Sequence, residues 1–196
     1  MIGYFLSFVI GFGFGIIPFS YILGKIKGVD LRQQGSGNIG ATNLGRSLGL
    51  GFFILGFLLD GFKGLIPVLL AQSLSMIPAL AGTGAIIGHI FNPLFKFKGG
   101  KGVSTIIGVA VGLTPRSFLI SIGVWLIVYL ATYVVSLASI CLAFVLPVII
   151  ILLKEANIMA RILIIVLCAF IIIAHRKNIQ RLAKGQEPKT VFWRKR

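Results

Sequence analysis

The chain has 196 residues, of which 57% are hydrophobic and only 12% are charged, and its mean hydropathy is +1.03. Soluble domains do not have this balance, so the composition predicts a polytopic membrane protein. The formal net charge of +15 comes from basic residues that stand between apolar runs. This placement favours anionic ligands and the membrane surface and indicates no nucleic-acid partner. The four acidic residues are too scattered for a carboxylate metal site, so no metal is expected.

Seven apolar runs predict the helices of the chain. The first has no basic start and no small-residue cleavage site, so we interpret it as a retained span. Along it, a neighbouring helix is expected to approach closely at Gly11, Gly13 and Gly15. The runs cover residues 1–24, 51–70, 76–95, 103–113, 117–131, 137–153 and 158–174. The pair on either side of Thr114-Pro115-Arg116 forms either two short spans or a re-entrant hairpin, because 103–113 is shorter than the roughly twenty residues that cross a bilayer.

The distribution of charge predicts the topology. If residues 103–131 cross the membrane twice, most of the 19 lysines and arginines fall on one side. The positive-inside rule assigns that side to the cytoplasm. We therefore predict an all-α, polytopic integral membrane protein with seven transmembrane or membrane-embedded helices, the amino terminus outside and the carboxyl terminus cytoplasmic. We expect one membrane-embedded domain over residues 1–196, with a basic tail from about 175 to 196.

Two apolar runs carry polar or reactive residues that we interpret as structural. Asp60 and Lys63 lie i,i+3 on one helical face, so they can pair, and an ion pair that fixes packing is favoured over a catalytic role. Cys141 and Cys168 have no metal-ligand spacing and are predicted to be buried and reduced.

The longest polar signature is GSGNIGATNLGR, residues 35–46. Gly-Ser-Gly-Asn favours a turn, and Thr42 or Asn43 is predicted near the N-cap of a following helix. Such a helix start attracts anions, and Arg46 could add a bidentate grip on phosphate. A turn and cap without function would give the same pattern.

A basic, glycine-rich loop, KFKGGKGVS, covers residues 96–104. Glycines 99, 100 and 102 allow positive φ angles that turn backbone N–H groups toward one anion, such as phosphate. A Walker A loop is excluded, because Phe95 and Gly102 stand where that motif requires Gly and Ser or Thr. The alternative is an ordinary charged loop between spans.

Two more polar segments adjoin predicted spans. Ser136 and Ser139 lie three apart at a helix start, where serines often bond to their own helix. His175 and Asn178 share a face where the last span ends, and they could hold phosphate or move a proton. All four polar segments fall on the same predicted face, so we expect one shared site.

Together, these segments resemble the bacterial acyl-phosphate:glycerol-3-phosphate acyltransferase family. The resemblance runs from about residue 10 to 187 through GIIPFSY, GSGNIGATNLGR, DGFKG, GHIFNPLFKFKGGKGV, VSLASI and HRKNIQRL. It implies a multi-pass enzyme of the bacterial cytoplasmic (inner) membrane, with its active site facing the cytoplasm. The implied reaction transfers a fatty acyl group from long-chain acyl phosphate to the 1-hydroxyl of sn-glycerol 3-phosphate. The products are lysophosphatidic acid and phosphate, in the first step of bacterial phospholipid synthesis. No cofactor is expected, and the enzyme that makes acyl phosphate is a candidate partner.

The same resemblance supplies the candidate site. The catalytic candidates are His175, Lys101, Arg46 and Ser136. The candidates for binding substrate or phosphate are Ser36, Gly37, Asn38, Thr42, Asn43, Gly99, Gly100, Gly102, Ser139 and Asn178. Three places depart from the family pattern: Asn92 replaces a usual proline, Tyr133 a basic residue and Lys177 a glutamate.

The residue types favour catalysis by positioning and charge. The His-x4-Asp dyad of other glycerol-phosphate acyltransferases is absent, since His89 leads to Leu94 and His175 to Gln180. No Ser-His-Asp triad is supported either. Acyl phosphate has a good leaving group, so cations and N–H donors that align two anionic substrates are the main requirement. The hydroxyl proton could pass to substrate phosphate or to His175.

Two other functions compete with this interpretation. A small transporter or channel for a phosphorylated metabolite would also need glycines and basic residues, but the chain shows no repeated half. A metal-dependent lipid phosphotransferase would need an acid-rich motif that the chain lacks.

Overall fold

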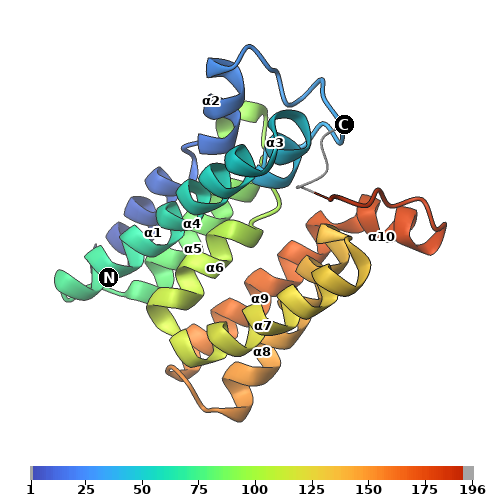
Figure 1. Ribbon diagram of the computed structural model, residues 1–196. Helices are drawn as coiled ribbons and strands as arrows, with labels where there is room; N and C mark the ends of the chain where they lie inside the picture. Colours follow the sequence, from blue (N-terminus) through green and yellow to red (C-terminus); the bar gives the residue numbers. More distant parts are fainter. Residues whose placement is uncertain (1, 192–196) are drawn as a thin grey trace. The chain divides into compact units, whose positions relative to one another are not determined.

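The structure is a computed structural model that describes residues 2–191, which fold into helices joined by loops (Figure 1). The helices are α1 (Ile2–Gly15), α2 (Phe19–Ile26), α3 (Ala41–Leu48), α4 (Leu50–Ser73), α5 (Pro78–Ile90), the 3-10 helix η1 (Pro93–Phe95), α6 (Val103–Leu113), α7 (Pro115–Thr132), α8 (Val135–Leu152), α9 (Ile158–Ala174) and α10 (Arg176–Ala183). No β-strand occurs in this part of the chain. The all-α prediction is confirmed for the described residues.

Several helices are long and apolar enough to cross a bilayer. Four stretches within residues 2–191 qualify by length and composition: Ile2–Ile26, α4, α7 and α8. A fifth qualifies if α9 and α10, which meet at a bend of 55°, form one span. The short α6 has 11 residues. The seven predicted spans and the orientation of the termini stay predictions.

The chain divides into two compact units, at the break between α6 and α7. The first unit contains the described residues 2–112, and the second contains residues 113–191. Pro115 stands at the first position of α7, as expected for a residue that lacks an N–H but suits a helix start. The single domain predicted over residues 1–196 stays a prediction.

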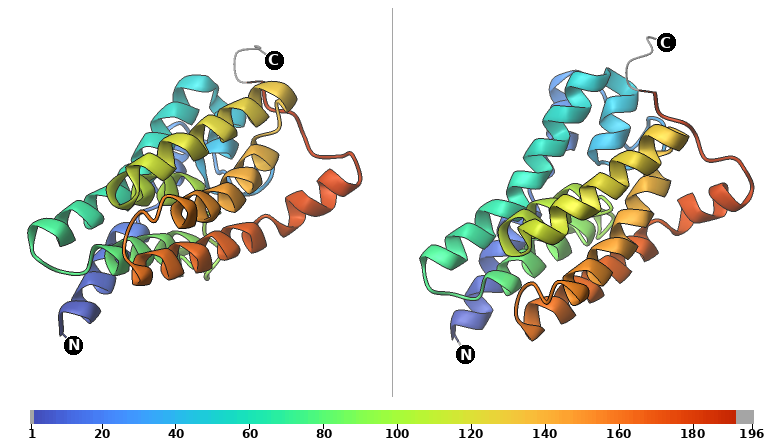
Figure 2. Two further views of the ribbon diagram at one scale, coloured as in Figure 1. Left: turned by 90° about the horizontal axis from the view of Figure 1, so that it is seen from below. Right: turned by 60° about the horizontal axis from the view of Figure 1, so that its bottom comes forward.

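In the first unit, α1 and α5 lie side by side (Figures 1 and 2). A Cβ atom at Gly11 would run into the backbone of Ala81, and one at Gly15 into the backbone of Ala85. Residues four apart share a helix face, so these two glycines form a flat surface for α5. Gly13 lies elsewhere on α1 and has nothing within 4 Å of its Cβ position. The predicted close approach is correct at Gly11 and Gly15 and wrong at Gly13.

The first apolar run is broken between α1 and α2, and a buried ion pair lies at the break. Lys63 Nζ lies 2.9 Å from Asp60 Oδ1 and donates to the carbonyl of Ile17 at 2.7 Å. Asp60 Oδ2 accepts a 2.6 Å hydrogen bond from Ser20 Oγ in α2. The side chains of Lys63 and Asp60 are 1% and 2% exposed. The predicted pairing is therefore confirmed, and it joins α4 to the Ile17 carbonyl at the break between α1 and α2.

The third apolar run becomes a shorter helix than predicted. The residue before a proline is disfavoured in the α-conformation, and Asn92, which precedes Pro93, is extended with φ −70° and ψ 116°. Consequently α5 ends at Ile90, and the apolar run 76–95 gives a helix of only 13 residues.

The loop Pro93–Lys98, called the 93–98 loop below, is strained and held by Asn92. Lys96 and Phe97 have φ angles of 52° and 60°, which cost on the order of 1–3 kcal/mol each in non-glycine residues. The Asn92 carbonyl accepts from the N–H of Phe95 and of Phe97 at 3.1 and 2.9 Å. The Asn92 side chain accepts from Leu94 N–H and donates to the Ile16 carbonyl at 2.8 Å. Asn92 therefore joins this loop to the break between α1 and α2.

In the second unit, α8 packs against both α7 and α9, and a glutamate caps α7. Glu155 accepts from the N–H of Arg116 at 3.0 Å and from the N–H and hydroxyl of Ser117 at 2.8 and 2.6 Å. Partial burial opposes ionisation, but these hydrogen bonds outweigh it and lower the pKa of Glu155. A carboxylate at a helix N-terminus is also favoured by the helix dipole. Glu155 therefore ties the α8–α9 loop to the start of α7.

The chain after α10 returns to α7. Residues 184–191, called the C-terminal strap below, run from the end of α10 back toward the α7–α8 connection (Figure 2). Thr190 N–H donates to the Tyr133 carbonyl at 2.7 Å, and Tyr129 Oη donates to the Thr190 carbonyl at 2.9 Å. The remainder of the predicted basic tail, 192–196, lies outside the described residues.

Candidate functional site

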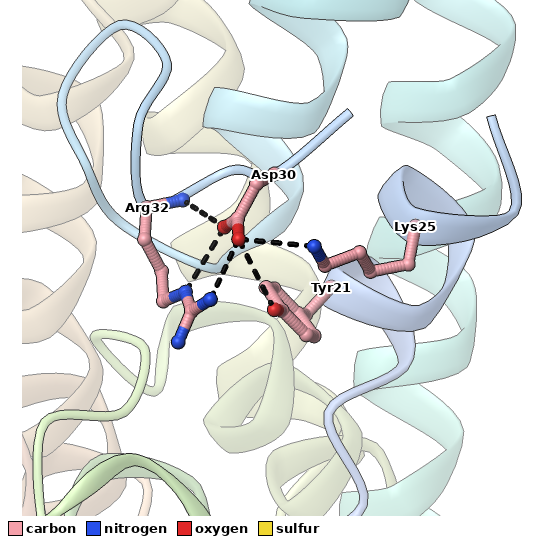
Figure 3. A network of polar contacts seen from close by, with 4 residues as sticks. All are labelled: Tyr21, Lys25, Asp30 and Arg32. Carbon is pink, nitrogen blue, oxygen red and sulfur yellow. Dashed lines mark hydrogen bonds and ion pairs between the residues drawn. The ribbon is translucent and has the colours of Figure 1, made fainter. Parts of the chain in front are cut away.

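A charged cluster stands where α2 leads into the first polar loop (Figure 3). Arg32 binds Asp30 through Nε at 3.0 Å and through its terminal nitrogen at 2.6 Å, and Lys25 Nζ lies 3.0 Å from the same carboxylate. The hydrogen bonds from Arg32, foremost, hold the pKa of Asp30 well below its usual range. Tyr21 Oη lies 3.5 Å from Asp30, and the Tyr21 ring makes an edge contact with Phe95 at 4.8 Å between centroids. Tyr21 thus contacts both polar loops of the first unit.

Asn43 organises the loop that contains the Ser-Gly-Asn signature. Its side chain is buried and donates to the carbonyls of Leu31 and Gln34, both at 2.9 Å. Its Oδ1 accepts from the N–H of Ser36 at 3.0 Å. Asn43 therefore shapes the loop, which leaves Ser36 exposed.

The helix after this loop begins where the Ala-Thr-Asn segment predicted a start. Gly40 is the N-cap of α3 and makes no side-chain cap, and Thr42 and Asn43 lie in the first turn directly after it, so their predicted position near the N-cap is confirmed. A glycine is accepted at this position because the extended backbone needs no side chain. Thr42 and Arg46 are half-buried and four residues apart, so they share one face of α3.

Two more predicted residues of this segment lie in turns. Asn38 Oδ1 accepts from the N–H of Gly40 at 3.0 Å, which closes a turn within the signature. Gly37 has φ of 69°, a left-handed conformation that glycine adopts without strain, and its N–H donates to the Gln34 carbonyl. The Asn38 side-chain oxygen and the Gly37 N–H therefore bond within the loop and stabilise its conformation.

The glycine–lysine loop differs from the expectation in how its glycines are used. Only Gly102, with φ of 85°, has a positive φ angle, whereas Gly99 and Gly100 do not. The N–H of Gly99 donates to the Ile90 carbonyl at 3.0 Å, and that of Gly100 to the His89 carbonyl at 3.1 Å. The prediction that these two N–H groups turn toward an anion is therefore wrong.

Gly99 and Gly100 are needed for a different reason. A Cβ at Gly99 would run into the His89 carbonyl, and one at Gly100 into the His89 imidazole. The loop thus packs directly on the end of α5, and half-buried Lys101 follows it at the start of α6. The first N–H groups of a helix have no intrahelical partners, so those at the start of α6, from Val103 onward, are of the kind that can donate to an anion.

In the second unit, Glu187 of the C-terminal strap gathers the predicted polar residues. Ser136 Oγ donates to Glu187 Oε1 at 2.8 Å, and Asn178 Nδ2 donates to the same oxygen at 2.6 Å. Arg181 Nε donates to Glu187 Oε2 at 2.6 Å. Burial opposes ionisation, but the bonds from Arg181, Asn178 and Ser136 outweigh it and lower the pKa of Glu187. A carboxylate with a lowered pKa is a weak base, so it orients Ser136 and does not deprotonate it.

Sequence reasoning missed Glu187 as a site residue. It is one of only four acidic residues in a chain of net charge +15, and that scarcity was the available signal.

His175 lies at the bend between α9 and α10, with a side chain that is 2% exposed. Its Nδ1 is 2.8 Å from the Ile171 carbonyl, which can only accept, so Nδ1 carries the hydrogen and Nε2 is the basic nitrogen. The Ser139 hydroxyl donates to the Val135 carbonyl and accepts from Trp125 Nε1 at 3.2 Å. Ser139 therefore bonds back to its own helix, as the structural alternative predicted.

The predicted site residues fall into two sets. Those of residues 36–46 and 99–102 belong to the first unit, and those of residues 136–139 and 175–178 belong to the second. Within residues 2–191, no group of three or more His, Cys, Asp or Glu side chains could hold a metal ion. Both cysteines of the chain are free thiols, with Cys168 buried and Cys141 partly so.

Comparison with known proteins identifies the family. The family model for glycerol-3-phosphate acyltransferase matches residues 5–185. The chain belongs to this family. Curated relatives named glycerol-3-phosphate acyltransferase include one from Thermosipho melanesiensis, 40% identical over 95% of this chain and 92% of that protein. Another, from Aquifex aeolicus, is 41% identical over 88% of this chain and 92% of its own length.

Two solved structures share the fold. One is the glycerol 3-phosphate form of PlsY (YgiH), an integral membrane glycerol 3-phosphate acyltransferase, with a TM-score of 0.90 and 38% identity. The other is the lysophosphatidic acid form of PlsY, with a TM-score of 0.88 and 36% identity. Each comparison covers 96% of this chain and 96% of the solved chain. The prediction of an integral membrane acyltransferase family is confirmed.

Proposed function

We propose that this chain transfers a fatty acyl group from acyl phosphate to the 1-hydroxyl of sn-glycerol 3-phosphate, giving lysophosphatidic acid and phosphate. The observation that carries the proposal is the near full-length likeness to PlsY in forms named for glycerol 3-phosphate and lysophosphatidic acid. Glycerol 3-phosphate is a phosphorylated acceptor, and lysophosphatidic acid is its acylated product. The acyl phosphate donor is proposed from the sequence motifs.

In the proposed reaction, the 1-hydroxyl oxygen forms a bond to the acyl carbonyl carbon. The bond between that carbon and the bridging oxygen of the mixed anhydride breaks, and phosphate leaves with the electron pair. The hydroxyl proton passes to a substrate phosphate oxygen or to Nε2 of His175. Phosphate is a good leaving group, so alignment and charge stabilisation carry most of the catalysis.

The predicted residues of each unit are proposed to contact substrate. Arg46, Lys101 and the start of α6 would hold phosphate groups, because guanidinium, ammonium and helix N–H groups are the donors that phosphate prefers. His175 and Asn178 would contact the acceptor and its hydroxyl. Ser136, oriented by Glu187, keeps its lone pairs for a substrate hydroxyl, and it is not a nucleophile in this scheme.

The setting of the enzyme is part of the same proposal. We infer a single functional domain in the bacterial cytoplasmic membrane, with its substrate site on the cytoplasmic side, as the distribution of basic residues favours. The acyl chain of the donor would stay in the lipid. An enzyme that makes acyl phosphate would supply the donor, because a mixed anhydride hydrolyses and is best delivered directly.

The test is an acyl transfer assay on purified protein with sn-glycerol 3-phosphate and one donor at a time. We expect lysophosphatidic acid from palmitoyl phosphate, none from acyl-CoA or acyl carrier protein, and no effect of EDTA. Arg46→Ala and Lys101→Ala should each lower kcat/KM by about 10²–10³-fold. Lys27→Ala, an exposed lysine of the same unit, is the control and should keep its activity. Product only from a thioester, or no product from folded protein, would overturn the proposal.

A further inference from the structure

The 93–98 loop exposes two large apolar side chains outside any helix long enough to cross a membrane. Leu94 is 65% exposed and Phe97 is 66% exposed. On a span, such exposure is ordinary, because the side chain faces lipid. In a loop that directly precedes Gly99 and Gly100, it needs another explanation.

Two lysines flank these apolar residues. Lys96 and Lys98 are both exposed. Within residues 2–191, the carboxylates are bonded elsewhere: Asp30 to Arg32 and Lys25, Asp60 to Lys63, Glu187 to Arg181, and Glu155 to the start of α7. The loop therefore combines exposed aromatic and aliphatic groups with cations that no acid of the described chain neutralises.

The exposed arrangement is built into the backbone. Lys96 and Phe97 both take left-handed φ angles, which non-glycine residues adopt at a cost. Buried Asn92 enforces the conformation through its carbonyl, which accepts from Phe97 N–H, and through its side chain, which anchors to Ile16. A relaxed loop would not need this bracing, so the fold holds Leu94 and Phe97 in a defined, outward arrangement.

We propose that the 93–98 loop is a membrane-interface anchor that inserts Leu94 and Phe97 among the headgroups of anionic phospholipids. Aromatic and aliphatic side chains beside lysines are the combination that membrane interfaces select. The lysines pair with lipid phosphates, and the apolar groups enter the acyl boundary. The anchor fixes the depth of the following residues 99–102 relative to the bilayer. A protein partner or a second copy of the chain is the competing occupant, and the experiment below separates them.

A nitroxide spin label at position 94 tests the proposal. Leu94→Cys is placed in a chain with Cys141→Ala and Cys168→Ala and reconstituted in nanodiscs, either of neutral phosphatidylcholine or with added phosphatidylglycerol. Accessibility to lipid-soluble oxygen is compared with accessibility to a water-soluble nickel chelate. The matched control label is at Gln33→Cys, an exposed residue of the polar loop in the same unit.

We expect the label at position 94 to be more accessible to oxygen than to the nickel chelate, and this difference should grow when phosphatidylglycerol is added. The label at position 33 should be more accessible to the nickel chelate. Lys96→Gln and Lys98→Gln should each lower the inserted-to-exposed ratio of the loop by roughly fivefold. Lys154→Gln, another exposed lysine with a positive φ angle, should leave the ratio unchanged. Nickel access at 94 equal to that at 33 would overturn the proposal. An inserted-to-exposed ratio that neither lysine substitution changes would also overturn it. A label at position 94 that is inaccessible to both reagents would indicate a protein contact and would overturn it as well.

Discussion

Glu187 shows how a single side chain can connect residues that lie far apart in the sequence. It accepts from Asn178, nine residues away, and from Ser136, 51 residues away, while Arg181 neutralises its charge. Three donors on one carboxylate hold the C-terminal strap against α8 and α10. The lowered pKa of Glu187 means that this arrangement depends on the ionised form.

The strap should therefore loosen in acid. A carboxyl group whose folded pKa is lowered contributes stability above its unfolded pKa of about 4.3 and loses it as pH falls through the folded value. We expect amide hydrogen exchange in residues 184–191 to be unchanged between pH 7 and 5, after correction for intrinsic rates, and to accelerate below about pH 4.3. Glu187→Gln removes the charge and turns an amide toward Arg181, so its strap should exchange fast at every pH. A wild-type strap that stays protected well below pH 4 in folded protein, or a Glu187→Gln strap as protected as wild type, would contradict the prediction.

Lys63 should matter for stability far more than an exposed lysine. Its removal leaves the buried Asp60 carboxyl group supported by Ser20 alone, and it takes the lysine donor from the Ile17 carbonyl, which keeps only the N–H of Phe19. Breaking one side of a buried ion pair costs about 3–5 kcal/mol. Lys63→Met should therefore lower the Tm measured in detergent by several degrees, and Asp60→Asn in the same chain should recover part of the loss.

Lys25→Met is the matched control for this experiment. It removes a lysine from the exposed Asp30 cluster of the same unit, where Arg32 still binds the carboxylate. We expect a negligible change in Tm. Equal effects of the two substitutions would show that burial does not distinguish the two ion pairs.

Residue-level prediction from sequence worked where partners are local. The pairing of Asp60 with Lys63 followed from their i,i+3 spacing alone. Glu187 could not be assigned in that way, because its partners lie on α8 and α10. The glycine–lysine loop shows a second limit: its glycines were rightly singled out, but Gly99 and Gly100 are required by the nearby His89, which spacing cannot reveal.

At the scale of elements, two glycines of α1 differ in whether they contact α5. Gly11 faces the backbone of α5, while Gly13 faces open space. Gly11→Ala should destabilise the protein by about 1–3 kcal/mol, because the added methyl forces α1 and α5 apart. Gly13→Ala should be neutral or stabilising by about 0.5–1 kcal/mol, because alanine favours the helix. Thermal unfolding of the two variants side by side measures the difference, and a destabilising Gly13→Ala would contradict this packing.

The helix boundaries were predictable where a residue type enforces them. The break at Thr114-Pro115 and the apolar runs that became α4, α7, α8 and α9 match the sequence closely. The early end of α5 was missed, although Pro93 carried the signal, because the apolar run continues past it to Phe95. The short helix α3 begins where its start signal at Ala41, Thr42 and Asn43 indicated, and Gly40 is its N-cap.

At the scale of the whole molecule, orientation in the membrane is open to a direct measurement. In a chain with Cys141→Ala and Cys168→Ala, Gln33→Cys reports on the first polar loop and Lys154→Cys on the α8–α9 loop. The charge distribution predicts that a membrane-impermeant maleimide modifies position 33 only from the cytoplasmic side and position 154 only from the outside. Vesicles of both orientations provide the comparison. Labelling of both positions from the same side of the membrane would contradict the predicted topology.

Composition predicted the class of the whole molecule, because a mean hydropathy of +1.03 leaves few alternatives to a membrane protein. The motifs predicted the family, which the match over residues 5–185 confirms. The number of membrane spans was harder to predict from the sequence. A count based on apolar length cannot distinguish a crossing helix from α6, which is short and whose role depends on its packing against α4.

The position of Glu187 after Ser136 and Asn178 in the sequence also orders the events of biosynthesis. A nascent chain can insert its helices one after another as the ribosome delivers them, and the first unit can fold early. Ser136 and Asn178 must wait for a residue that is translated after both of them. A chain from which Glu187 has not yet emerged, or one that ends before it, therefore has Ser136 and Asn178 without their shared acceptor. Quality control would meet such a product as a membrane-inserted protein with buried polar groups that are not yet paired.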